Sequence, residues 1–137
     1  MAEAVFERMV QEAGLSDLIE VDSAGTGAYH VGEPPHKGTQ SVLSQHGIRY
    51  NGRARQITAG DYQATDYVIA MDASNEATLR RRFGDHPHLY RLLDFADKTT
   101  TRDVPDPYYE GGFDRVYDLV EDGARGLLAH IRQEEQL

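Results

Sequence analysis

The feature that most constrains the fold is an unbroken apolar run, Tyr67-Val-Ile-Ala-Met71. A half-buried strand would alternate apolar and polar residues, and this run does not. An unbroken run of this length is typical of a strand buried on both faces of a parallel sheet. The next four residues, Asp72-Ala-Ser-Asn75, supply side chains that can cap a following helix. The sequence therefore predicts a strand followed at once by a helix.

The rest of the chain alternates between strands and helices in the same way. Apolar residues at helical spacing predict helices at residues 2–13, 37–46, 76–83 and 113–131. Further strands are predicted at residues 19–23, 54–57 and 88–93. A capping-box-like pattern that opens at Thr58 predicts one more short helix. We therefore expect a single α/β domain over residues 1–137, with a mainly parallel sheet flanked by helices in three layers.

The composition excludes several classes of function. The formal charge of −9 and a pI near 5.0 argue against a nucleic-acid partner, and the run Arg80–Arg82 is explained as the solvated end of a helix. No apolar run approaches the roughly 18 residues of a membrane span, and no secretion signal opens the chain as given. We expect a cytoplasmic protein with no membrane partner. The 137 residues contain no cysteine, which excludes disulfides and thiol nucleophiles within them.

Residues 94–112 form a long segment with neither helical nor strand periodicity. Structureless connections longer than about 12–15 residues are usually functional or disordered. Pro105 and Pro107 bracket Asp106 and favour an extended backbone there, and two tyrosines follow. A carboxyl group held beside aromatic rings suits a general acid that protonates a phenolate leaving group, whose conjugate acid has a pKa of about 10. An ordinary proline turn with surface tyrosines fits the composition equally well.

Other candidates lie where predicted strands end. In α/β folds, ligands bind beyond the carboxyl ends of the strands, so Ser23, Asp72 and Asp106 are expected to share one site. Each has a plainer interpretation: Ser23 as a turn residue and Asp72 as a helix N-cap. Tyr29 is either a wall of an aromatic slot or a half-buried loop anchor. The six histidines show no ligand spacing, and we expect no metal site.

Taken in order, several blocks resemble those of the low-molecular-weight protein tyrosine phosphatases, over the whole length of the chain. The matching stretches are residues 1–6, 21–26, 29–35, 46–48, 54–57, Ala70-Met-Asp-Ala-Ser-Asn75 and Val104-Pro-Asp-Pro-Tyr-Tyr109. The last block, in this order with the others, is the specific signal. The resemblance implies a four-stranded parallel sheet flanked by helices and an enzyme that uses no metal or cofactor.

The resemblance also implies roles for individual residues. Asp106 matches the family's general acid. Tyr108 and Tyr109 match the aromatic pair beside it, and Tyr29 matches the opposite wall that selects aryl substrates.

Two further positions are matched by the resemblance. Ser23 matches a serine that hydrogen-bonds the phosphate-binding loop, and Asp72 matches the acid of the Met-Asp-x-Ser-Asn block. Asn51-Gly52 departs from the serine and the histidine that relatives commonly carry there, where the histidine supports the same loop.

A larger departure concerns the catalytic loop itself. In the family, a cysteine, five residues and then arginine, serine and proline come directly before the block that here begins with Met1. The first strand, the thiolate nucleophile and the phosphate-binding arginine are thus absent from the 137 residues. Because losing a nucleophile can cost on the order of 10⁶ in rate, we expect this form to be inactive.

The missing strand also has a consequence for stability. In the family it lies inside the sheet, and each apolar side chain that it buries is worth about 1.5–3 kcal/mol. Its absence would also leave unpaired strand edges. We therefore expect the chain either to rearrange its sheet or to cover the gap by self-association.

Three functional interpretations follow. The first is a tyrosine phosphatase whose true start lies upstream, acting on a phosphotyrosine protein or a small aryl phosphate once the loop is restored. The second is a non-catalytic pseudophosphatase or oligomerising module. The third is a related arsenate reductase or arginine phosphatase, although the tandem tyrosines after Asp106 favour aryl phosphates.

Overall fold

The computed structural model describes residues 1–27, 31–106 and 112–137. The predicted aromatic residues Tyr29, Tyr108 and Tyr109 lie outside the described residues. In chain order the elements are α1 (Ala2–Glu12), α2 (Lys37–Gln45), α3 (Ala59–Ala64), β1 (Val68–Ala70), α4 (Ala73–Phe83), β2 (Leu89–Arg91), the 3-10 helix η1 (Leu92–Phe95) and α6 (Phe113–Glu135).

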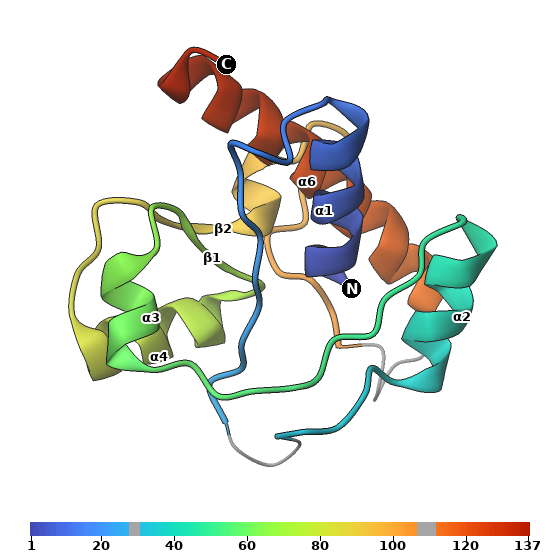
Figure 1. The fold of residues 1–137 in the computed structure, drawn as a ribbon. Helices are drawn as coiled ribbons and strands as arrows, with labels where there is room; N and C mark the ends of the chain where they lie inside the picture. Colours follow the sequence, from blue (N-terminus) through green and yellow to red (C-terminus); the bar gives the residue numbers. More distant parts are fainter. Residues whose placement is uncertain (28–30, 107–111) are drawn as a thin grey trace.

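Strands β1 and β2 form a parallel pair in which Val68 lies opposite Leu89 and Ala70 lies opposite Arg91. Successive residues of β1 face opposite sides of this pair. Val68 and Ala70 belong to a smaller core with side chains of α3 and α4, whereas Ile69 packs against the larger core. Figure 1 shows the strands between these two groups of helices. The apolar run is therefore buried from both sides, and the predicted parallel α/β arrangement is confirmed.

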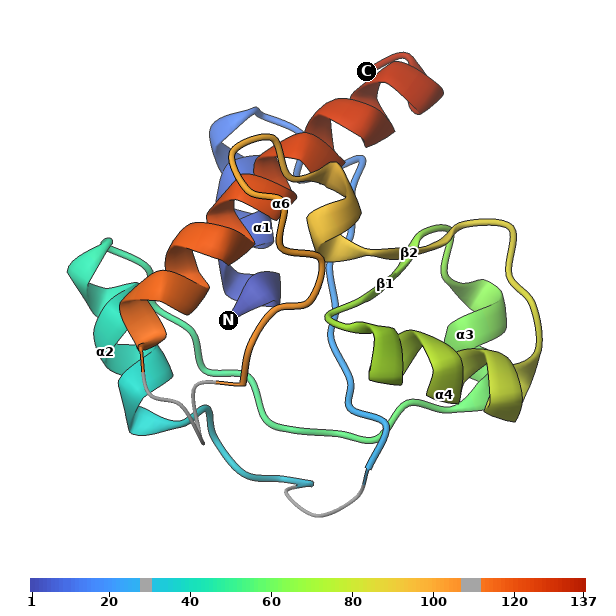
Figure 2. The same cartoon turned by 180° about the vertical axis from the view of Figure 1, so that it is seen from behind.

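The larger core forms around α6, which packs against α1, α2 and η1. Its apolar residues recur at helical spacing, so one face of the helix is continuous and Val120 and Ala124 are fully buried. The ring of His46, just after α2, stacks on Tyr117 of α6 with centroids 3.8 Å apart. Figure 2 shows α6 running along the whole of this half of the molecule. The longest helix thus holds the N-terminal helix, α2 and the end of the sheet together.

The predicted strands at residues 19–23 and 54–57 are wrong as regular strands. Among the described residues, the backbones here form one parallel bridge, between Gln56 and Gly25, which lies just beyond residues 19–23; Gly25 N donates to Arg55 O and Ile57 N donates to Gly25 O, both at 2.8 Å. Alternating polar and apolar residues indicate that one face of an extended segment is buried. A regular strand also requires a neighbouring strand that is hydrogen-bonded to it along its length. Similarly, the strand predicted at residues 88–93 is shorter, because Leu92 begins the turn of η1.

Helix ends follow the local signals in the sequence. Thr58 and Asp61 form a reciprocal capping box at the start of α3, as predicted. The last turn of α4 carries three exposed arginines, Arg80, Arg81 and Arg82. Their positive charges interact favourably with the negative end of the helix dipole. This confirms the predicted solvated helix end. Among the described residues, no helix combines the length and the apolar character needed to span a membrane.

Candidate active site

The carboxyl end of β1 is hydrogen-bonded to the segment that leads to Asp106. Asp72 is the N-cap of α4, and its Oδ1 accepts a hydrogen bond of 2.7 Å from Asn75 N. One residue earlier, the carbonyl oxygen of Met71 accepts a hydrogen bond of 2.9 Å from Val104 N. Asp106 is exposed and lies two residues beyond Val104. The loop that carries Asp106 is thus attached where β1 ends.

The same loop is attached a second time, through Asp103. Its Oδ1 accepts hydrogen bonds from Ala73 N at 3.0 Å and from Arg91 Nη1 at 3.2 Å. Arg91 is the last residue of β2, and its Nε lies 3.9 Å from Glu76 Oε2 in the first turn of α4. The segment before Asp106 is therefore bonded to the ends of β1 and β2 and to the start of α4.

Ser23 contacts the start of α1. Its hydroxyl donates to Glu3 Oε1 in the first turn of α1. The hydroxyl of Tyr50 donates to the same oxygen at 3.0 Å, and burial raises the pKa of Tyr50. Within the described residues, Ser23 thus connects its own segment to the start of α1. In both views this segment passes the end of β1 (Figures 1 and 2).

An arginine fixes the segment on which Ser23 lies. Arg55 donates through Nη2 to Asp22 Oδ2 and through Nη1 to Asp61 Oδ2, both at 2.8 Å. The hydrogen bond from Arg55 is the main reason why the pKa of Asp61 is lowered, and the two carboxylates in turn raise the pKa of the guanidinium. Asp61 also belongs to the capping box of α3. The backbone on either side of the Gly25–Gln56 bridge is therefore tied together by side chains as well.

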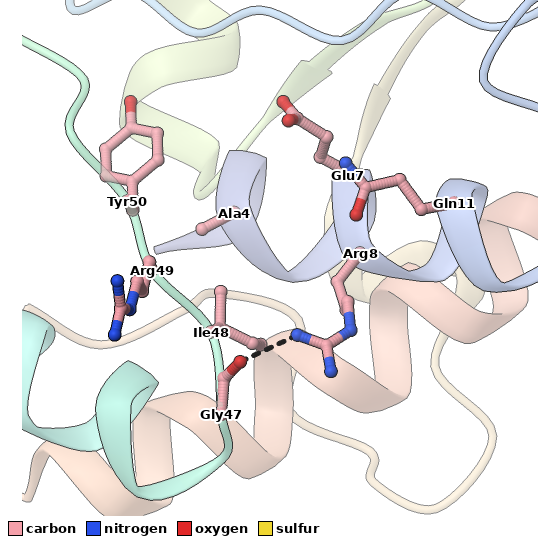
Figure 3. Close-up of a pocket in the computed structure, with 8 residues that line it drawn as sticks. All are labelled: Ala4, Glu7, Arg8, Gln11, Gly47, Ile48, Arg49 and Tyr50. Carbon is pink, nitrogen blue, oxygen red and sulfur yellow. Dashed lines mark hydrogen bonds between the residues drawn. The ribbon is translucent and has the colours of Figure 1, made fainter.

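Two pockets of the described surface lie away from these residues. A pocket of about 320 Å³ lies between α1 and the segment after α2 (Figure 3). Its lining residues are Ala4, Glu7, Arg8, Gln11, Gly47, Ile48, Arg49 and Tyr50. Arg8 Nη1 donates to Gly47 O at 2.8 Å across it. A second pocket, of about 410 Å³, lies between α3 and the loop after α4. Neither contains one of the predicted site residues that the structure describes.

Several residues at this edge were not predicted from the sequence. Glu3, Tyr50, Arg91 and Asp103 all make their contacts across long separations in the chain. Of these four, only Asp103 had a local signal in the sequence, because it begins the stretch that contains Pro105 and Pro107. Among residues 1–27, 31–106 and 112–137, no group of three or more histidine, aspartate or glutamate side chains is placed to hold a metal ion.

Comparisons with known proteins agree on one family. The family model for low molecular weight phosphotyrosine protein phosphatase matches residues 1–137. The low molecular weight protein-tyrosine-phosphatase YfkJ of Bacillus subtilis is 46% identical over 140 residues, which cover 100% of this chain and 90% of that protein. The chain therefore belongs to the low molecular weight phosphotyrosine protein phosphatase family.

Solved structures support the same assignment. The crystal structure of YfkJ from Bacillus subtilis has a TM-score of 0.93 at 45% identity, covering 97% of this chain and 86% of that one. The crystal structure of a protein tyrosine phosphatase from Entamoeba histolytica has a TM-score of 0.89 at 33% identity, covering 98% of this chain and 88% of that one. The crystal structure of the drosophila arginine phosphatase DARP has a TM-score of 0.86 at 30% identity, covering 96% of this chain and 88% of that one.

The likeness to YfkJ bears on the expected response to the missing strand. A TM-score of 0.93 over 97% of the chain means that the described elements keep the arrangement of that relative. The likeness concerns the path of the backbone, and the described sheet holds two paired strands, β1 and β2, so the expected rearrangement of the sheet stays a prediction. The other expected response, self-association, also stays a prediction.

Proposed function

We propose that this chain carries the acid-catalysis and substrate-recognition half of a phosphotyrosine phosphatase, and that Asp106 is its general acid. The observation that supports the proposal is the attachment of the Asp106 loop to the end of β1, through Val104 N and Met71 O at 2.9 Å. Ligands of parallel α/β sheets bind beyond this end of the strands. Tyr29, Tyr108 and Tyr109 are proposed as the aromatic walls that select aryl phosphates. Ser23 and Asp72 are proposed to support the loop that holds the phosphate.

The nucleophile must come from outside these 137 residues, because they contain no cysteine. We propose that a preceding segment supplies a cysteine–x5–arginine loop, and that the chain alone hydrolyses nothing. In the joined form, the thiolate attacks phosphorus, the bond from phosphorus to the phenolic oxygen breaks, and Asp106 gives its proton to that oxygen. Water then releases phosphate from the sulfur. We further propose that the protein is cytoplasmic and acts without a cofactor.

The test compares four proteins: the 137-residue chain, the chain extended by such a segment, and the D106N and D17N variants of the extended chain. Asp17 is an exposed aspartate in the turn after α1 and serves as the matched control. We expect phenyl phosphate turnover only in the extended forms. D106N should lower it by about 10²–10⁴-fold, the usual contribution of a general acid, and D17N should not change it. Absence of turnover in the extended chain, or equal activity of D106N, would contradict the proposal.

One neighbour motivates a second candidate substrate. DARP is described as an arginine phosphatase, and it shares 30% identity with this chain. Phosphoarginine has no aromatic ring, so an aromatic slot would give it little advantage. The extended chain should therefore prefer phosphotyrosine to phosphoarginine peptides in a direct competition assay. A preference for phosphoarginine would assign the chain to the arginine phosphatases.

We also propose that the 137-residue chain self-associates along the side of β1 that faces away from β2. Among the described residues, β1 is paired with β2 along one side only, and this leaves the backbone groups of its other side as an open edge. Sedimentation velocity at increasing concentration should show dimers or larger species for the 137-residue chain. The extended form, in which a strand covers that edge, should stay monomeric under the same conditions.

A further inference from the structure

The ion pair between Arg91 and Asp103 stands directly before the loop that carries Asp106. We propose that Arg91 and Asp103 are positioning residues, which fix where the carboxyl group of Asp106 lies relative to the substrate. The proposal rests on the function proposed above for Asp106. Neither residue touches the substrate, and each acts through the backbone of residues 103–106.

The carboxylate of Asp103 is bonded to two separate elements. Its Oδ1 accepts from Ala73 N at 3.0 Å and from Arg91 Nη1 at 3.2 Å. Ala73 is the first residue of α4, so its N–H has no partner within that helix and the loop supplies one. A charged acceptor makes both hydrogen bonds stronger than their neutral equivalents. Asp103 therefore connects the loop to the start of α4 and to the end of β2 at the same time.

The guanidinium of Arg91 is itself held in place. Its side chain is only 28% exposed, and its Nε is buried without a hydrogen-bond partner among the described residues. Glu76 Oε2, in the first turn of α4, lies 3.9 Å from that Nε. The planar guanidinium of Arg91 lies between two carboxylates. Such a group loses less conformational freedom for each hydrogen bond that it forms than a lysine ammonium does. Both anchors of the loop thus belong to regular secondary structure and not to another loop.

The path from this anchor to the general acid is short and stiff. Val104 N donates to Met71 O at 2.9 Å, so residues 103 and 104 are both fixed at the end of β1. Only Pro105 separates them from Asp106, and the ring of a proline fixes its φ angle. A shift of the anchor is therefore passed to Asp106 instead of being absorbed. Displacements of about 1 Å in a catalytic group can cost on the order of 10²-fold in rate.

The first test measures how strongly the rate depends on the leaving group, in the extended chain. A displaced general acid harms substrates that need protonation, such as phenyl phosphate, more than esters of a strongly acidic phenol. We expect D103A to lower kcat/KM for phenyl phosphate by about 10–10²-fold and to change the nitrophenyl ester far less. The matched control is D85A. Asp85 pairs with Arg80, Nη1 to Oδ1 at 3.3 Å, on the exposed end of α4, and D85A should leave both rates unchanged.

The second test needs no activity and uses the 137-residue chain. Amide hydrogen exchange at Val104 should be about tenfold faster in D103A than in D85A, because one anchor of its hydrogen bond is gone. R91K, with R80K as control, should give the same direction and covers the case in which D103A folds poorly. Unchanged exchange at Val104 would overturn the proposal, as would an equal fall for both esters. Lack of turnover in the unmutated extended chain would instead contradict the proposed function, and the exchange result would still decide whether this pair anchors the loop.

Discussion

A Cβ atom added to Gly126 would lie 1.8 Å from the carbonyl oxygen of Phe95 and 2.8 Å from its carbonyl carbon. Helix α6 therefore lies against η1 with no room for a side chain, and the blocking atoms belong to the backbone. The neighbouring Gly123 shows the same closeness, with the Leu92 carbonyl oxygen 2.9 Å from the added atom. This contact fixes how near the loop after β2 approaches the longest helix.

Replacement of Gly126 by alanine should destabilise the protein. Alanine gains about 1 kcal/mol over glycine in a helix interior, but overpacking a tight contact costs about 1–3 kcal/mol and sometimes more. Because backbone must move here, we expect a net loss of about 2 kcal/mol, measured by urea unfolding. G60A in α3 is the control, since its added Cβ meets only Thr58 Oγ1 at 3.7 Å. Equal stability of the two variants would mean that α6 and η1 are farther apart than described.

Asp122 is a buried charged residue of the described core and holds the start of the long loop. It is 6% exposed, and its carboxylate accepts hydrogen bonds from Asp97 N at 3.0 Å and Lys98 N at 2.9 Å. D122A leaves both N–H groups without these acceptors, and we expect a loss of about 2–4 kcal/mol in the free energy of unfolding. D118A, on the exposed side of the same helix, should stay within about 0.5 kcal/mol of the parent. A small effect of D122A would show that water replaces the carboxylate at no cost.

These two contacts show where prediction from the sequence ends. The helix at residues 113–131 follows from its apolar spacing, and the structure extends it over Phe113–Glu135. That spacing identifies a buried face, but it does not say which backbone lies against Gly126 or which N–H groups meet Asp122. Their partners are more than 20 positions away in the chain. Local propensity and periodicity carry no information about such pairings.

Asp72 tests a choice that the sequence left open, between a helix cap and a residue of the site. The structure shows the cap, with Oδ1 accepting from Asn75 N at 2.7 Å. D72A should cost about 1 kcal/mol in stability, whereas D72N should cost little, since asparagine caps helices as well as aspartate does. Thermal unfolding of both variants measures this. If D72N in the extended chain keeps its stability but loses phosphatase activity, Asp72 has a second role in which its charge matters.

The candidate site was predictable in part, for a physical reason. Asp72 and the loop that carries Asp106 follow from strand ends and proline signals, which are local, and Val104 of that loop is bonded to Met71 at the end of β1. The tie between Ser23 and Glu3, and that between Arg91 and Asp103, depend on how segments cross in space. The weakly paired segment at residues 19–23 illustrates the same limit, since its alternation predicted a strand that lacks regular partners. The aromatic walls at Tyr29, Tyr108 and Tyr109 stay predictions.

Tyr67 should make the protein lose stability at alkaline pH. Burial, and then the hydrogen bond from its hydroxyl to Glu135 Oε1 at 2.8 Å, raise the pKa of Tyr67 to about 12. In the unfolded chain the pKa is about 10, so between these values the folded state keeps a proton that the unfolded state has released. Since the unfolded state then binds fewer protons, stability is complete below pH 10 and falls as the pH rises towards 12.

Two variants measure the contribution of Tyr67. Y67F has no proton to lose, so its Tm should fall less than that of the parent in steps from about pH 9 to pH 12. Burial also raises the pKa of Tyr50, Tyr62 and Tyr117, so part of the fall should persist. E135Q removes the charge but not the burial, and should lie between Y67F and the parent. Parallel curves for the parent and Y67F would show that the hydroxyl of Tyr67 ionises equally easily in the folded and unfolded states.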